Sequence, residues 1–151
     1  MLGLNTNVNT KSDGLAWNMK IAIGSDHRGF EAKKQIKAII QQLGHECVDV
    51  GTNSNDPVDY PDAAYIAALA VSSSEVDRAI LACGTGIGMS ITANRFKGVR
   101  AGLCHNIYTA RMARLHNNAN ILVMGGRVIG DGLAIEMLDV LLLLNIVCRG
   151  R

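Results

Sequence analysis

Proline, excess charge of one sign and closely spaced cysteine are all scarce in this 151-residue sequence, and each shortage excludes a class of protein. With 2 prolines, 16 glycines and 48% hydrophobic residues, the chain is neither collagen-like nor disordered and fits one globular domain. A net charge of +2 is too small and too dispersed to build a nucleic-acid stripe or a polybasic membrane patch. We therefore expect a small-molecule partner, and neither nucleic acid nor a membrane.

Cysteines and long apolar runs are also limited. The sequence has no C-x-x-C pair, which argues against a zinc knuckle or a disulfide frame and favours the reducing cytoplasm; its cysteines are Cys47, Cys83, Cys104 and Cys148. The most apolar stretch, 133–148, is interrupted by polar residues and is shorter than the roughly 20 residues of a membrane-spanning helix. It predicts a buried helix. The helix 133–147, with its run 141–144, exceeds one core-facing stripe, so we expect this helix to contribute to a subunit interface.

The amino-terminal segment differs in composition from the rest. Residues 1–18 are Asn-rich and lack the basic and apolar regions of a secretion signal, so we predict a disordered extension. Met19 stands directly before the first strand-like run. We expect residues 19–151 to form a single domain.

From Lys20 onward, β-rich runs alternate with helical patterns, which is typical of β-α-β units. The predicted strands are 20–25, 46–50, 77–82, 99–104 and 119–124. The predicted helices are 30–43, 61–73, 87–95, 106–115 and 130–147. The fold class is therefore α/β, an open, doubly wound sheet of five parallel strands of the Rossmann or flavodoxin-like kind, with the predicted strand order 2-1-3-4-5.

Two glycine patterns in this chain fail as nucleotide motifs. Residues 24–29 have the glycine spacing of a P-loop, but Phe30 and Glu31 follow where Lys and Ser or Thr are required. The glycines of 84–88 do not match G-x-G-x-x-G and come after the third predicted strand rather than the first. Neither pattern favours a nucleotide site.

The glycine turn 84–88 suits a function other than nucleotide binding. At the start of a helix it exposes successive backbone N–H groups, which suit an anion or a developing oxyanion. Cys83 opens the turn, and nearby N–H groups favour a thiolate. A thiolate beside an oxyanion hole suits acyl transfer or proton abstraction next to a carbonyl. The alternative is that Cys83 is a small buried residue at the end of a strand.

Five motifs occur in one order along the chain. They are Gly-Ser-Asp-His-Arg-Gly-Phe at 24–30, Asp-Tyr-Pro at 59–61, Cys-Gly-Thr-Gly-Ile-Gly at 83–88, His-Asn-Asn-Ala-Asn at 116–120 and Gly-Gly-Arg-Val at 125–128. Together they resemble ribose-5-phosphate isomerase type B, of the family that also contains the galactose-6-phosphate isomerase subunits. The resemblance implies a pentose-phosphate-pathway enzyme that interconverts ribose 5-phosphate and ribulose 5-phosphate through an enediolate, without a metal or a cofactor.

The resemblance also implies roles for single residues. Cys83 is the base, Thr85 and its turn hold the enediolate oxygen, and His116 helps to open the furanose ring. Some family members have a catalytic glutamate where this chain has Met89, which favours the cysteine as base. His27 and Arg127 match phosphate-binding positions. The implied substrate-binding residues are Asp26, His27, Tyr60, Gly84, Gly86, Ile87, Gly88, Asn117 and Arg127.

Some of these residues have alternative structural roles. Asp26 could cap the first helix, Tyr60 could pack before Pro61, and His116 could simply end the fourth helix. At the carboxyl end, Arg149 and Arg151 stand where family members have an arginine-rich tail that reaches a partner's phosphate, and the match is poor. A hexose-6-phosphate isomerase of the same family and a noncatalytic sugar-phosphate-binding module stay open as alternative functions.

The helix predicted over 106–115 separates two histidines. His105 and His116 flank it and lie about 16 Å apart along its axis. Only one end of the helix can adjoin Cys83, and the strand ends place the His105 end there. We therefore expect His116 and Asn117 to serve the site of a neighbouring subunit, in a homodimer or a dimer of such dimers.

Overall fold

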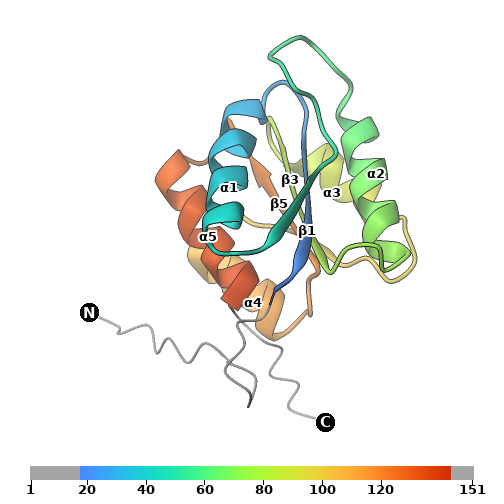
Figure 1. Ribbon diagram of the computed structural model, residues 1–151, viewed down its shortest axis with the longest axis vertical. Helices are drawn as coiled ribbons and strands as arrows, with labels where there is room; N and C mark the ends of the chain where they lie inside the picture. The colour runs from blue at the N-terminus through green and yellow to red at the C-terminus, as the bar shows by residue number, and fades with distance from the viewer. Residues whose placement is uncertain (1–17, 144–151) are drawn as a thin grey trace.

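The computed structural model describes residues 18–143, in which strands and helices alternate strictly (Figure 1). The elements are β1 (Lys20–Ser25), α1 (Phe30–Gln42), β2 (Glu46–Asp49), α2 (Tyr60–Ser72), β3 (Arg78–Cys83), α3 (Ile87–Ala93), β4 (Ala101–Leu103), α4 (Ile107–Leu115), β5 (Ile121–Gly125) and α5 (Asp131–Leu143). The predicted five-stranded parallel α/β architecture is confirmed. Residues 1–17 of the predicted extension, the end of the last predicted helix, Arg149 and Arg151 lie outside the described residues.

The order of the strands corrects the prediction at one edge of the sheet. The observed order is β2-β1-β3-β5-β4, so the predicted order 2-1-3-4-5 was wrong for the last two strands, which are interchanged. β5 has five residues, all buried, and pairs with β3 on one side and β4 on the other. β4 has only three residues, all half-buried, which suits an edge. The longer, fully apolar strand therefore takes the interior position.

The direction of each crossover decides which face a helix covers. Right-handed connections place α2 and α3 on one face of the sheet and α1, α4 and α5 on the other, as Figure 1 shows. Side chains alternate accordingly along each strand. Ile80 and Ala82 of β3 point to the α1–α4–α5 face, while Leu81 and Cys83 point to the α2–α3 face.

The two ends of the described chain are both tied into the core. Met19 is buried and its N–H donates to His45 Nδ1 at 3.2 Å. Leu141 and Leu142 of α5 are also buried, in the cluster that α1 and α4 share. Leu141 and Leu142 are therefore core residues, and the contribution of this helix to a subunit interface stays a prediction.

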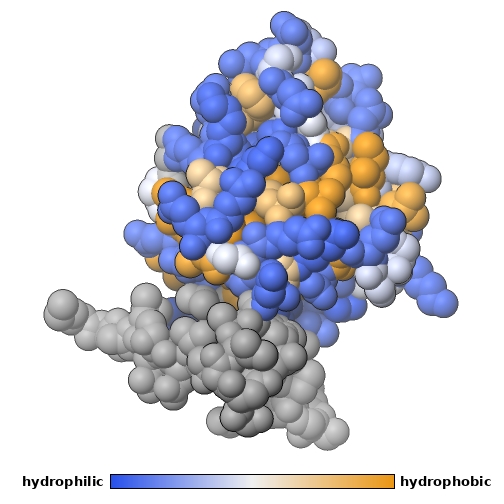
Figure 2. Space-filling view, viewed as in Figure 1, coloured by the Kyte–Doolittle hydropathy of each residue, from blue (hydrophilic) through white to orange (hydrophobic). Residues whose placement is uncertain are grey.

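Exposed apolar side chains gather elsewhere, on the outer surfaces of α2 and α3. Orange atoms mark this region over α2 in Figure 2. Tyr65, Ile66 and Leu69 of α2 and Ile87 and Ile91 of α3 are each about half exposed. Within residues 18–143, no helix combines the length and apolarity needed to cross a bilayer.

Candidate active site

The carboxyl ends of β1, β3 and β5 meet at a pocket of about 280 Å³. Segments that are far apart in the sequence supply its lining: Asp26 and Arg28 after β1, Tyr60 at the start of α2, Cys83, Gly84, Thr85 and Gly88 at the end of β3, and Arg127 and Val128 after β5. A parallel sheet brings these turns together because all its strands end at the same edge. Predicted site residues from four of the motifs, namely Asp26, Tyr60, Cys83, Gly84, Thr85, Gly88 and Arg127, thus share one cavity.

Cys83 is the last residue of β3 and lies in this pocket, with only 4% of its surface exposed. Its Sγ accepts a hydrogen bond from the N–H of Gly86 at 3.2 Å. Gly86 has a φ of +80°, and a Cβ there would lie 2.4 Å from Leu103 Cδ1. Glycine is therefore required at this position to turn the backbone N–H towards the sulfur.

The rest of the turn is packed closely by neighbouring side chains. A Cβ on Gly88 would lie 2.5 Å from the Tyr60 ring, so that ring lies directly against the start of α3. The hydroxyl of Thr85 accepts the N–H of Ile87 at 3.3 Å. His105 Nε2 lies 3.3 Å from the Thr85 carbonyl oxygen. The turn is held from several sides, which preorganises its polar groups.

Asp26 fixes the turn after β1. Its Oδ1 accepts the N–H groups of Arg28 at 2.8 Å and Gly29 at 3.1 Å, and its own N–H donates to the Ala82 carbonyl at 3.2 Å. The residue is only 2% exposed, yet it lines the pocket. Asp26 thus closes the turn that precedes α1 and borders the site; it does not cap the helix, because the N-cap of α1 is Gly29 and no side chain bonds there.

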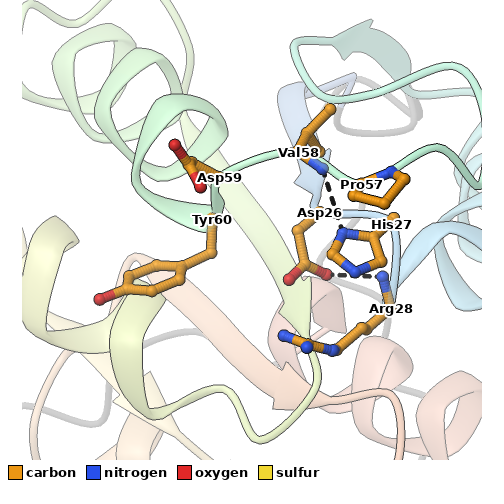
Figure 3. Close-up of a pocket in the computed structure, with 7 residues that line it drawn as sticks. All are labelled: Asp26, His27, Arg28, Pro57, Val58, Asp59 and Tyr60. Carbon is orange, nitrogen blue, oxygen red and sulfur yellow. Dashed lines mark hydrogen bonds between the residues drawn. The ribbon is translucent and has the colours of Figure 1, made fainter.

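A second cavity of about 440 Å³ adjoins the first and shares Asp26, Arg28 and Tyr60 with it. His27, Pro57, Val58 and Asp59 complete its wall (Figure 3). His27 Nδ1 accepts the N–H of Val58 at 3.2 Å, which joins the turn after β1 to the loop between β2 and α2. In the neutral ring this bond places the proton on Nε2.

The loop between β2 and α2 is also held by a buried lysine of α1. Lys33 is 1% exposed; its Nζ lies 2.8 Å from Asp49 Oδ1 and also donates to the Thr52 carbonyl. Burial acts to raise the pKa of Asp49, but hydrogen bonds from Lys33, Lys37 and the Gly51 N–H outweigh it and hold that pKa below its usual value. Lys33 therefore ties α1 to the loop that forms one wall of the second cavity.

Four predicted site residues do not line either cavity. Gly86 shapes the turn and Ile87 projects outward, 52% exposed. His116 ends α4, and Asn117 lines a separate cavity of about 430 Å³ with Asn94 and Arg100. The opposite end of α4 adjoins the Cys83 turn through His105, as the helix length predicted.

Sequence reasoning missed several residues that the fold brings to the site. Arg28 lines both cavities and Val58 lines the second, and neither was singled out as a site residue. The position of Arg28 directly after β1, within a quoted motif, was the available signal. Among residues 18–143, no group of three or more His, Cys, Asp or Glu is placed to hold a metal ion.

Comparison with known proteins gives a consistent picture. Residues 21–147 match a family model described as Ribose/Galactose Isomerase. The chain is 48% identical over 120 residues to the ribose-5-phosphate isomerase B of Escherichia coli, covering 80% of both chains. It is 46% identical to a 4-deoxy-4-sulfo-D-erythrose isomerase of a Clostridium species, covering 82% of this chain and 79% of the relative. The solved ribose-5-phosphate isomerase B of Clostridium thermocellum superposes with a TM-score of 0.83 at 49% identity, covering 85% of this chain and 86% of the other.

Proposed function

Because the chain belongs to the ribose/galactose isomerase family and is thus a sugar-phosphate isomerase, we propose that it interconverts ribose 5-phosphate and ribulose 5-phosphate with Cys83 as the base. One observation carries this proposal. The Cys83 sulfur receives the Gly86 N–H and shares a pocket with the glycine turn and with Asp26, Tyr60 and Arg127. The backbone donor stabilises negative charge on the sulfur, as a proton-abstracting thiolate requires.

The proposed reaction moves one proton between two carbons of the open-chain sugar. The Cys83 thiolate takes the proton from C2, and the electrons of that C–H bond form a C1–C2 double bond while the C1 carbonyl oxygen becomes negative. The thiol then returns the proton to C1. The proton of the C2 hydroxyl moves to the oxygen on C1, which leaves the ketone of ribulose 5-phosphate at C2.

The turn after Cys83 supplies the group that would stabilise the enediolate. Because the Thr85 oxygen accepts the Ile87 N–H, its hydroxyl proton is available to donate to the enediolate oxygen. Asp26 Oδ1 is occupied by backbone donors, and its second oxygen is available to a sugar hydroxyl. Because the proposed base is a thiol, the enzyme is expected to work in a reducing compartment such as the cytoplasm.

The proposed active site is composite. His116 and Asn117 lie at the end of α4 away from Cys83, so we infer that they open the sugar ring in the site of a second copy. The exposed apolar surface of α2 and α3 supports a homodimer that places the two copies together on this side of the sheet.

Turnover of ribose 5-phosphate tests the reaction directly. The wild-type protein in excess EDTA should form ribulose 5-phosphate, and Cys83→Ala should lose at least about a hundredfold of kcat, as for the loss of a general base. Cys83→Ser is the matched control for packing and should be nearly as inactive. Full activity of Cys83→Ala would rule out the thiol as base.

Substrate competition tests the sugar. The relative named for 4-deoxy-4-sulfo-D-erythrose makes a four-carbon substrate the second candidate. Ribose 5-phosphate, erythrose 4-phosphate and galactose 6-phosphate should be compared by kcat/KM, with the five-carbon sugar expected to rank first. Binding of all three without turnover would identify a noncatalytic sugar-phosphate-binding module.

Mixed oligomers test the composite site. Cys83→Ala and His116→Ala are each expected to be inactive alone, whereas mixed dimers contain one site with both residues intact. Co-refolding equal amounts should restore roughly a quarter of wild-type activity if the chains pair at random. No recovery in dimers that demonstrably exchange would show that both residues serve the same subunit.

A further inference from the structure

We propose that Arg28 binds the anionic end of the substrate together with Arg127, an inference that rests on the proposed isomerase reaction. Arg28 lines both adjoining cavities, and Arg127 lines the one that contains Cys83. The two arginines come from turns after different strands, β1 and β5. They approach each other only because these strands flank β3 in the folded sheet.

The two side chains converge on Gly84, the residue that follows Cys83. A Cβ on Gly84 would lie 3.0 Å from Arg28 Cδ and 3.9 Å from Arg127 Cδ. Both arginine stems therefore run past the same point of the turn. The absence of a side chain at Gly84 leaves space for them beside the thiol.

Neither guanidinium is neutralised by the surrounding protein. Within residues 18–143, neither the Arg28 nor the Arg127 guanidinium forms an ion pair or a hydrogen bond. Asp26 and Asp59 line the same cavities, but Asp26 Oδ1 is occupied by the backbone N–H groups of Arg28 and Gly29. Two like charges that converge without a counter-ion form a site that an anion stabilises.

The backbone holds Arg28 in place for this role. Because the Arg28 N–H is fixed by Asp26, the side chain starts from a rigid point. In the close-up it runs beneath Asp26 towards the open space beside Tyr60 (Figure 3). The neighbouring His27 ring is held separately, because its Nδ1 accepts the Val58 N–H. A planar guanidinium can bind two oxygens of a phosphate through two parallel N–H groups, whereas a lysine ammonium acts as a point charge without that fixed fork.

Steady-state kinetics separate binding from catalysis. With ribose 5-phosphate, Arg28→Ala should raise KM at least about tenfold and leave kcat within about threefold, because the anion is bound equally in ground and transition states. The inhibition constant of inorganic phosphate should rise by the same factor. Arg28→Lys should recover part of the loss, since it keeps the charge without the fork.

Lys34→Ala is the matched control. It removes one positive charge from an exposed side chain of α1 that pairs with Glu31 on the same helix, and it should leave KM and phosphate inhibition unchanged. Circular dichroism of each variant checks folding; Arg28→Ala retains the main-chain bonds to Asp26. Unchanged KM and phosphate inhibition in Arg28→Ala would overturn the proposal. A fall in kcat at constant KM would also overturn it, because the arginine would then act on the enediolate.

Direct binding separates this inference from the proposed reaction. Inorganic phosphate should bind the wild-type protein in a calorimetric titration and bind Arg28→Ala at least about tenfold more weakly. If the wild type binds phosphate through Arg28 yet does not convert ribose 5-phosphate, the anion site stands and the proposed substrate fails. If ribose 5-phosphate is converted and Arg28→Ala binds phosphate normally, the reaction stands and the anion site fails.

Discussion

The two faces of the sheet are packed with side chains of different size. Against α1, α4 and α5 the strands and helices bury large residues such as Ile21, Ile80 and Met137. Against α2 and α3 the buried residues include a run of alanines on α2: Ala63, Ala64, Ala67, Ala68 and Ala70. Small residues let α2 approach the sheet closely, so its larger apolar side chains lie outside. The α1–α4–α5 layer thus buries its large apolar side chains in the core, whereas the α2–α3 layer exposes several of them at its outer surface.

The candidate site belongs to the second face. Cys83 packs in the same cluster as the alanines of α2, and Tyr60 begins that helix. The thiol and the exposed apolar surface are therefore on the same side of the sheet. This arrangement supports the proposal that a second copy completes the site from that side. The difference between the faces indicates that the large side chains of one face contribute most to stability, whereas the other face carries the surface through which we propose that two copies assemble.

Polar substitutions on the outer surface of α2 and α3 should have the largest effect. Leu69→Asp combined with Ile91→Asp places charges on side chains that are 46% and 56% exposed. We expect the protein to become monomeric in sedimentation velocity and to lose at least about a hundredfold of its activity, as for loss of catalytic groups supplied by a partner. Leu43→Asp, 48% exposed at the end of α1, is the control and should change neither. If the double variant is a dimer of normal activity, the outer surface of α2 and α3 is not the interface between the two copies.

Truncation of the large-side-chain face should be the most destabilising single change. Ile80→Ala empties a fully buried position in the centre of the sheet and should lower the free energy of unfolding by about 4 kcal/mol. Ile80→Val, which removes one methylene group, should cost about 1 kcal/mol. Urea unfolding measures both. Equal small losses would show that this face tolerates cavities.

Removal of the anionic partner of buried Lys33, on the same face, should be the next most destabilising change. Asp49→Asn leaves Lys33 buried without its anionic partner and should cost about 3 kcal/mol at pH 7. The pKa of Asp49 is lowered in the folded protein, so the carboxylate stabilises the fold above its unfolded pKa and this contribution is lost as the pH falls through the folded value. The difference between wild type and variant should therefore start to shrink as the pH falls through the unfolded pKa of about 4, and should vanish only below the lower folded pKa, where Asp49 is protonated in both states. A difference that is constant from pH 7 to pH 3 would contradict this origin.

Enlarging the small-side-chain face should cost least. Ala67→Leu forces a large side chain between α2 and the sheet and should destabilise by about 2 kcal/mol. Ala38→Leu makes the same exchange at an exposed position of α1, where the expected change is under about 0.5 kcal/mol. Denaturant midpoints provide the measurement. A neutral Ala67→Leu would mean that α2 can move away from the sheet at little cost.

The periodicity of the sequence predicted each strand and helix to within a few residues. The apolar run 119–124 and the amphipathic pattern of 30–43 each lie within one segment of the chain, so the strand and the helix could be predicted from that segment alone. The order of β4 and β5 was not readable in this way. Both orders allow right-handed connections, and the choice depends on how many partners each strand can satisfy.

The candidate site was predicted in part for a similar reason. Cys83 and its glycines are consecutive, so their chemistry could be seen in the sequence. Arg28 carries no such signal, because its importance comes from Gly84 and Arg127, which are distant along the chain. Arg28 is an exposed arginine after a strand, and only its place beside Gly84 and Arg127 distinguishes it from other solvated charges.

The sequence by itself determined the alternating α/β pattern and the place of the Cys83 turn at the carboxyl end of a strand, because these follow from short-range periodicity and from the parallel direction of β-α-β units. The tertiary structure decided the strand order, the face that each helix covers and the convergence of Arg28 with Arg127 on Gly84. These features depend on packing between segments that are distant in the chain. Side-chain volume and pairing between strands, rather than local pattern, select among the arrangements that the sequence allows.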